Sequence, residues 1–267
     1  MLNSTQPHSC LAQVFSFDYL TYYDSEFIPE KFNSYNLATY LFFGTGEFAS
    51  FGESEQNIIS YREYHVHFAY ALNFEEKFQI TVAPQLGGLF ANGISSISYG
   101  DVWILGKYRF SNTIPIAFRL GFKLGKIGKS FWLKQNDFDI GILASKSFLC
   151  LKIGGAISYR IRGKSEFDLL DFAGRFNQPG NAISYKFELY NQFTKELGLS
   201  VFFLGQASED KKIDGTLLAN SNSRKTTVGA SMKIRNTDEY SYKLGILVDV
   251  AGKHDKKGFA IGFTLMH

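Results

Sequence analysis

The sequence predicts an all-β fold, a transmembrane antiparallel β-barrel of about twelve strands within a range of about ten to fourteen. Three observations support it: a composition rich in strand-forming aromatics, an alternation of apolar with polar or small residues, and connections that alternate in length. Of the 267 residues, 27 are Phe and 15 are Tyr, whereas only 5 are Pro. This balance favours strands, and no apolar run approaches the roughly 18 residues that a membrane-spanning helix needs.

The alternation is clearest in residues 114–126. Large apolar side chains fall on one face of this segment: Ile114, Ile116, Phe118, Leu120, Phe122 and Leu124. The other face carries small or charged residues: Ala117, Arg119, Gly121, Lys123 and Gly125. Successive side chains of a strand point to opposite faces, whereas a helix would scatter these residues around its circumference. The segment is therefore predicted to be a strand with one apolar face.

The same pattern recurs along the chain. Strands are expected at residues 12–23, 61–73, 77–90, 97–110, 114–126, 135–148, 151–163, 180–193, 197–208, 224–235, 240–252 and 257–267. The connections between them are alternately short and long, which is typical of barrels with short periplasmic turns and longer extracellular loops. The longest, residues 24–60, contains an apolar stretch at 40–43 that could belong to an additional hairpin. One barrel domain is expected over residues 12–267, and residues 1–11 are either a residual signal segment or a polar lead.

Two features indicate that the apolar face meets lipid. A barrel of about twelve strands has an interior too wide for one layer of side chains to fill, which favours a hydrated lumen. Aromatic residues on the apolar face also fall near the two ends of the strands, as expected of interfacial girdles. They are Phe15, Tyr70, Phe78, Phe110, Phe148, Phe193 and Tyr240 at the turn end, and Tyr23, Tyr64, Phe138, Tyr159, Tyr185 and Phe259 at the loop end.

The opposite face then lines the lumen, and its charged residues are candidate selectivity groups. The main candidates are Arg119, Lys123, Arg160, Lys186, Glu188, Asp101, Asp137 and Asp139, and Lys107, Lys152, Lys233 and Lys243 share this face. Arg119, Lys123, Lys186 and Glu188 are expected near mid-barrel, with the three aspartates toward the outer mouth. This arrangement predicts a modest anion preference; the alternative is that the charges pair with one another.

The sequence gives little support for binding of a metal ion or a nucleic acid. Glu63, His65 and His67 share the inward face of one strand, but no fourth metal ligand is evident nearby, so a hydrated triplet is favoured and no metal or cofactor is expected. The net charge of +3 is spread along the chain without a basic block, which argues against nucleic-acid binding. The cysteines Cys10 and Cys150 show no zinc-site spacing.

The predicted loop at residues 164–179 is too apolar for a fully solvated segment. Its apolar residues are Phe167, Leu169, Leu170, Phe172 and Phe176. They are expected either to fold into the barrel mouth as a lid or to pack on the rim.

Residues 60–165 contain the segments YGDVWILGKYRF, GFKLGKIGK and ASKSF, the first of which includes Gly100, Asp101 and Lys107. These segments resemble the family of outer-membrane proteins named for the MetA pathway of phenol degradation. The resemblance implies a barrel that is associated with the uptake or handling of hydrophobic, often aromatic, compounds.

Together these features predict a channel for the passive passage of small molecules, hydrophobic or anionic, in the outer membrane of a Gram-negative bacterium. The expected partners are outer-membrane lipid, the transported small molecule and the barrel-assembly machinery. No catalytic residue is expected, because none of the five histidines lies near a serine on the apolar face. The alternatives are a lipid-modifying enzyme and a non-conducting structural or surface-interaction barrel.

Overall fold

A computed structural model of the chain describes residues 34–49, 56–74, 77–91, 94–110, 116–125, 135–166, 176–217, 219, 222–236, 240–253 and 257–266. Within these ranges no helix is long and apolar enough to cross a bilayer.

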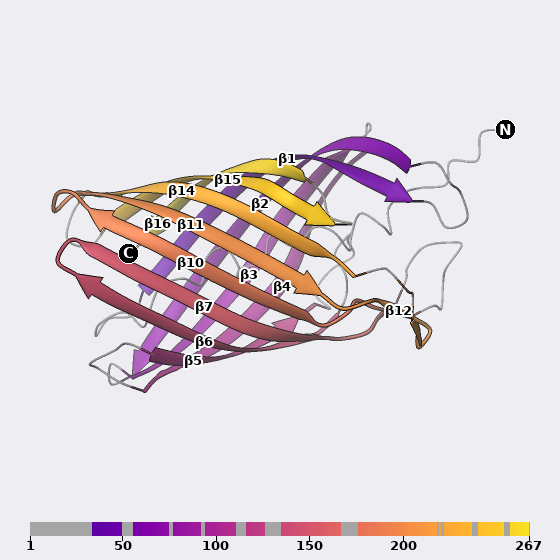
Figure 1. Ribbon diagram of the computed structural model, residues 1–267, viewed down its shortest axis with the longest axis horizontal. Helices are drawn as coiled ribbons and strands as arrows, with labels where there is room; N and C mark the ends of the chain where they lie inside the picture. The colour runs from indigo at the N-terminus through magenta and orange to yellow at the C-terminus, as the bar shows by residue number, and fades with distance from the viewer. Residues whose placement is uncertain are drawn as a thin grey trace.

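Twelve long strands of the described chain close into a single antiparallel barrel (Figure 1). They are β1 (Ser34–Ala49), β2 (Gln56–Phe74), β3 (Phe78–Ala91), β4 (Ile94–Arg109), β5 (Ile116–Leu124), β6 (Asp137–Phe148), β7 (Leu151–Arg162), β10 (Ala182–Gln192), β11 (Leu197–Ser208), β14 (Arg224–Arg235), β15 (Ser241–Lys253) and β16 (Lys257–Met266). Each strand pairs with its neighbours along the chain, and β1 pairs with β16 to complete the ring. Closure removes the unpaired strand edges that lipid could not satisfy.

The first predicted strand is wrong in position. The place between β2 and β16 is taken by β1, which pairs with β2 from Ser34 to Ala49 and with β16 from Asn36 to Thr45. The apolar stretch at residues 40–43, which the sequence suggested for an additional hairpin, lies within β1. Residues 12–23 lie outside the described residues. Period-two alternation is present in both segments, and only pairing with both neighbours decides which one closes the barrel.

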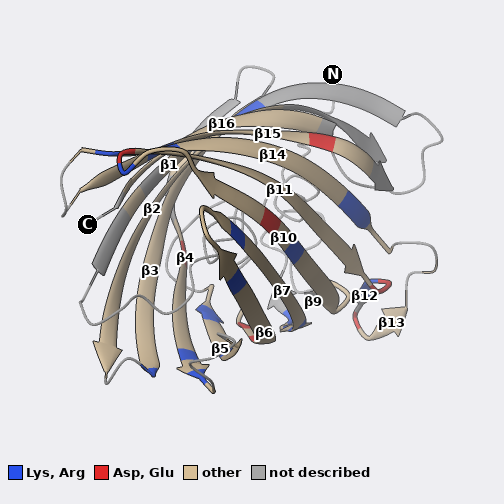
Figure 2. Ribbon diagram, turned by 60° about the vertical axis from the view of Figure 1, so that its left-hand side comes forward, with Lys and Arg blue, Asp and Glu red and all other residues tan. Residues whose placement is uncertain are grey.

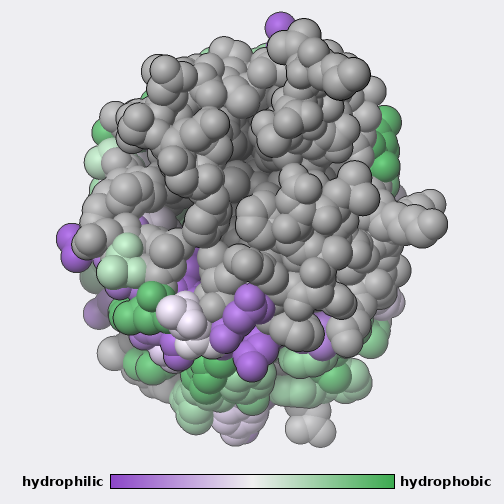
Figure 3. Space-filling view, turned by 90° about the vertical axis from the view of Figure 1, so that its right-hand side faces the viewer, coloured by the Kyte–Doolittle hydropathy of each residue, from purple (hydrophilic) through white to green (hydrophobic). Residues whose placement is uncertain are grey.

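The strands alternate between exposed apolar and buried side chains, as predicted. In β6, Asp137, Asp139 and Leu143 are buried, whereas Ile140 and Ile142 between them are exposed. An outward face of exposed Ile, Leu, Val and Phe is the surface that a barrel presents to acyl chains. In Figure 3, which faces the loop end, the described part of the flank is coloured hydrophobic and hydrophilic residues gather closer to the centre of this end.

Exposed aromatic residues mark both ends of the outward face. At the turn end they include Tyr70, Phe78, Phe110, Phe148 and Phe193, and at the loop end Phe138, Tyr159, Tyr185 and Phe259. Tyr64 and Tyr240 are half-buried, and Phe15 and Tyr23 lie outside the described residues. The two bands correspond to the interfacial girdles that the sequence predicted.

The two ends of the barrel differ in their connections. The turn between β6 and β7 consists of Leu149 and Cys150 alone, and Leu149 has a φ of 53°. At the other end, short strands from two loops form a second sheet in the order β13-β12-β9-β8 (Figure 2). These strands are β8 (Ser165–Glu166), β9 (Phe176–Gln178), β12 (Lys212–Ile213) and β13 (Thr216–Leu217).

Candidate functional site

The inward face of β4 to β7 carries a buried network of charges. The Nζ of Lys123 lies 3.1 Å from the Oδ2 of Asp101 and 3.0 Å from the Oδ2 of Asp137. The amide of Gln135 also donates to Asp137, at 3.0 Å. Lys123 is therefore held between two carboxylates that the sequence placed at the outer mouth.

Asp139 is the centre of the second part of this network. Its Oδ1 accepts hydrogen bonds from the Nη2 of Arg119 at 2.8 Å and from the Nε of the same residue at 3.2 Å. Its Oδ2 lies 3.6 Å from the Nε of Arg160, whose guanidinium sits 4.9 Å from the centre of the Trp103 ring. Arg119 places two guanidinium nitrogens on a carboxylate, and Arg160 lies over an aromatic ring. Both geometries suit the planar guanidinium of Arg better than the ammonium group of Lys.

The ion pairs of this network join three cations with three carboxylates. Arg119, Lys123 and Arg160 oppose Asp101, Asp137 and Asp139, and all six side chains are at most 9% exposed. The contacts fit the expectation that lumen charges pair with one another.

Large apolar side chains also point inward, which the sequence did not predict. They are Trp103, Leu105, Leu143, Phe202, Leu204 and Leu247. Trp103 and Leu105 pack with Ala69 and Ala83, and Leu143 packs with Ala117. Leu105 is 0% exposed, so water does not reach its side chain. Alternation shows which face is outward, but it does not require the inward face to be polar throughout.

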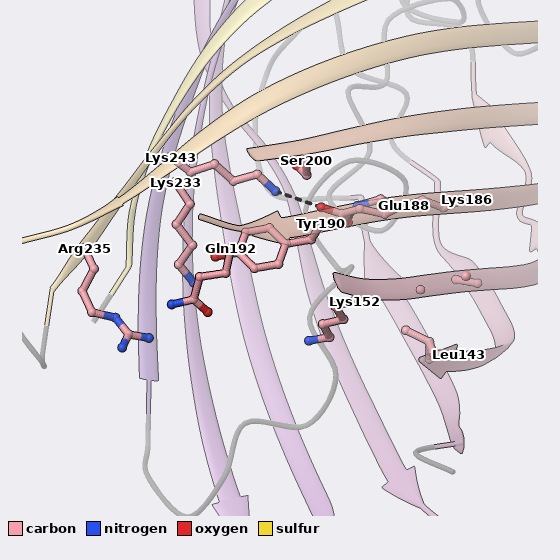
Figure 4. A pocket seen from close by; sticks show the side chains of 13 residues that line it. Leu143, Lys152, Lys186, Glu188, Tyr190, Gln192, Ser200, Lys233, Arg235 and Lys243 are labelled. Atoms are coloured by element: carbon pink, nitrogen blue, oxygen red, sulfur yellow. Dashed lines mark ion pairs between the residues drawn. The ribbon is translucent and has the colours of Figure 1, made fainter. Parts of the chain in front are cut away.

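A cavity of about 510 Å³ lies inside the barrel against β7, β10, β14 and β15 (Figure 4). It occupies the turn half of the lumen, because Lys152, Gln192 and Arg235 come directly beside the short turns. The described side chains that line it include five cations and one carboxylate, Glu188. The cations are Lys152, Lys186, Lys233, Arg235 and Lys243.

Strand register brings these cations together. Lys233 on β14 is the direct cross-strand partner of Lys243 on β15, and Lys152 on β7 is the partner of Tyr190 on β10. Like charges placed opposite each other destabilise a sheet. A pairing of this kind that serves no packing purpose is typical of a functional site.

Glu188 is shared by two lysines on the cavity wall. Its Oε2 lies 3.0 Å from the Nζ of Lys186, and its Oε1 lies 3.6 Å from the Nζ of Lys243. Both ammonium groups also lie near the Phe202 ring, at 5.4 and 5.9 Å from its centre. Figure 4 shows the side chain of Lys243 reaching toward Glu188 on another strand, and the side chain of Lys233 pointing toward Gln192.

The sequence placed Lys152, Lys186, Glu188, Lys233 and Lys243 on the inward face, and the structure gathers them around this cavity. The sequence analysis did not identify Arg235, Tyr190 and Gln192, which also line the cavity. Arg235 follows Lys233 by two residues, so period two alone could have assigned it to the same face.

The proposed histidine triplet is only partly described. His65 and His67 are buried on the inward face of β2, with ring centres 6.2 Å apart, and the Nδ1 of His65 lies 3.0 Å from the Nε2 of Gln85. The side chain of Glu63 lies outside the described part. Among the described residues, no group of three or more His, Cys, Asp or Glu could hold a metal ion.

The candidate lid is not described either. Phe167, Leu169, Leu170 and Phe172 lie outside the described residues, as does the side chain of Phe176. The two ends of this loop form β8 and β9, and β9 pairs with β12 of the neighbouring loop.

Solved structures share this architecture. An outer membrane channel from Pseudomonas putida F1 is similar with a TM-score of 0.74 at 11% sequence identity, over 92% of this chain and 98% of that chain. The chain has the fold of outer-membrane β-barrels. The transport unit of the autotransporter AIDA-I from Escherichia coli gives a TM-score of 0.54 at 12% identity, over 97% and 94% of the two chains. The NanC porin gives 0.50 at 8% identity, over 85% and 98%.

No family model matches the sequence, and no curated protein does. At these identities the structural similarity establishes the fold, and the function has to come from the residues of the lumen.

Proposed function

We propose that this protein is an outer-membrane channel that passes small molecules through its lumen and prefers anions. The observation that carries the proposal is the cationic cavity, where five Lys and Arg side chains face one carboxylate. A cleft of one charge sign between walls of low dielectric raises the local concentration of the opposite ion. The carboxylates of the network on β4 to β7 are held in ion pairs with Arg119, Lys123 and Arg160 and do not face this cavity.

The substrate class extends the proposal. Tyr190 adds an aromatic ring to the cavity wall, so that a small organic anion with a ring or short chain would combine charge pairing with apolar contact. The resemblance to the phenol-degradation family also favours hydrophobic or aromatic compounds. A lid formed by the loop at residues 164–179 and assembly by the barrel-assembly machinery belong to the same proposal.

The test is the reversal potential of the refolded protein in a planar bilayer that separates two KCl concentrations. The wild type is expected to favour chloride over potassium by roughly tenfold. The triple variant Lys152→Gln, Lys233→Gln, Arg235→Gln removes three of the cavity cations and should bring the permeability ratio close to one.

A second triple variant serves as the matched control. Lys77, Lys195 and Lys212 are exposed and lie in a turn or a loop. Replacing these three with Gln removes the same charge from the protein and should leave the ratio unchanged. A cation preference in the wild type would refute the anion proposal, and an absence of conductance would favour a structural barrel or an enzyme.

A further inference from the structure

The lipid-facing wall contains a groove of about 500 Å³ on β6, β7 and β10. Its floor is a row of three cross-strand partners, Ala144, Gly155 and Phe187. Ala144 and Gly155 have little or no side chain, whereas Ile153 and Ile157 flank Gly155 along β7. The groove is therefore a notch between the two isoleucine side chains on the outward face of β7. Its volume falls within the range of small-molecule sites, roughly 300–1,000 Å³.

The turn end of the groove carries a cation. Lys146 lines the groove, and its Nζ lies 5.0 Å from the centre of the Phe148 ring. Phe148 belongs to the exposed aromatic band at the turn end, and such bands lie at the level of lipid headgroups. The ammonium group of Lys146 is thus held where the groove meets the headgroup region.

We propose that this groove is a binding site for one anionic phospholipid of the periplasm-facing leaflet. An acyl chain lies over Gly155 between Ile153 and Ile157, and the phosphate pairs with Lys146. The charge at one end and the apolar floor match the two parts of such a lipid. The site lies on the outer surface, and neither Lys146 nor the flanking isoleucines line the lumen cavity.

Gly155 offers a clean way to fill the groove. A Cβ built at this position meets only the carbonyl oxygen of Lys186, at an ordinary contact distance of 3.4 Å. The Gly155→Leu variant should therefore fold while its side chain occupies the notch. Gly106 on β4 is a matched control, because its Cβ would meet only the Phe78 ring, at 3.8 Å.

The experiment is native mass spectrometry of the delipidated full-length barrel titrated with dioleoylphosphatidylglycerol. The wild type should bind the first phosphatidylglycerol molecule at least tenfold more tightly than any further one. Gly155→Leu should lose this tight lipid, and Gly106→Leu should retain it. Lys146→Gln should weaken its binding about tenfold, whereas Lys195→Gln, at an exposed turn lysine, should not.

Dioleoylglycerol, which has the same chains without the phosphate, separates the two halves of the site. Its binding should be lost in Gly155→Leu and unaffected in Lys146→Gln. Retention of the tight phospholipid by Gly155→Leu, or its equal loss from Gly106→Leu, would overturn the proposal. If Lys146→Gln bound phosphatidylglycerol as tightly as the wild type, the phosphate contact would be refuted. Far-ultraviolet circular dichroism confirms that each variant is folded.

Discussion

Glu188 limits the positive charge of the lumen cavity, because it pairs with both Lys186 and Lys243. The variant Glu188→Gln removes the one carboxylate among the described lining residues and leaves all five cations. Its chloride-to-potassium permeability ratio should rise severalfold, because the counter-ion concentration follows the local charge. Reversal potentials in a planar bilayer measure this ratio. Glu209 is exposed near the loop end, and Glu209→Gln should leave the permeability ratio unchanged. A lower ratio in Glu188→Gln than in the wild type would contradict the role of Glu188 in limiting the positive charge.

Leu149 has a backbone conformation that suits glycine. It is the first residue of a two-residue turn, and its φ of 53° is in the left-handed region that an L side chain adopts at a cost of about 1–2 kcal/mol. Leu149→Gly should be more stable than Leu149→Ala by about 1 kcal/mol, because both lose the side chain but only Gly relieves the backbone. Urea unfolding in lipid vesicles provides the comparison. Equal stabilities would show that this turn is not strained.

At the scale of strands, Asp139 joins β5, β6 and β7 through Arg119 and Arg160. Removing one member of a buried ion pair leaves a buried charge without its partner, which costs about 3–5 kcal/mol. Asp139→Asn should therefore lower the free energy of unfolding by an amount in this range. The same substitution at Asp214, an exposed turn residue, should cost less than about 0.5 kcal/mol. A loss of similar size at both positions would rule out a stabilising role for the network.

The strands themselves were largely predictable, because period-two alternation is strong in segments such as β5 and β7. Register was predictable only across short turns. The two-residue turn after Phe148 places Asp139 opposite Arg160, and this pairing follows from counting back from the turn. Lys123 and Asp137 are also partners, but the connection between them is long, so the sequence does not set their register. The position of β1 depends on closure with β16 and could not be predicted from local pattern.

Across the whole barrel, the sequence predicted which face is outward but not how the interior is divided. Period two places Leu105 and Leu143 on the inward face, but their packing against Ala69, Ala83 and Ala117 of other strands depends on the closed ring. The cavity brings Lys152 of β7 together with Lys233 and Lys243 of β14 and β15, which lie about 80 to 90 residues later in the sequence, and this proximity depends on the closed ring. Ion pairing in one sector and cationic surplus in another are properties of the closed barrel.

The central claim is that β7 and β14 each have one face that meets water in the turn half of the lumen and one face that meets lipid. Thiol accessibility tests it directly, with single cysteines at residues 152, 153, 233 and 234 in a Cys10→Ser, Cys150→Ser background. A membrane-impermeant, negatively charged thiol reagent is added to the protein in lipid vesicles. It should modify Lys152→Cys and Lys233→Cys quickly, because these positions face the hydrated lumen. It should modify Ile153→Cys and Ile234→Cys at least tenfold more slowly, because these positions face lipid. Equal rates at neighbouring positions, or faster reaction at the isoleucine positions, would contradict the account.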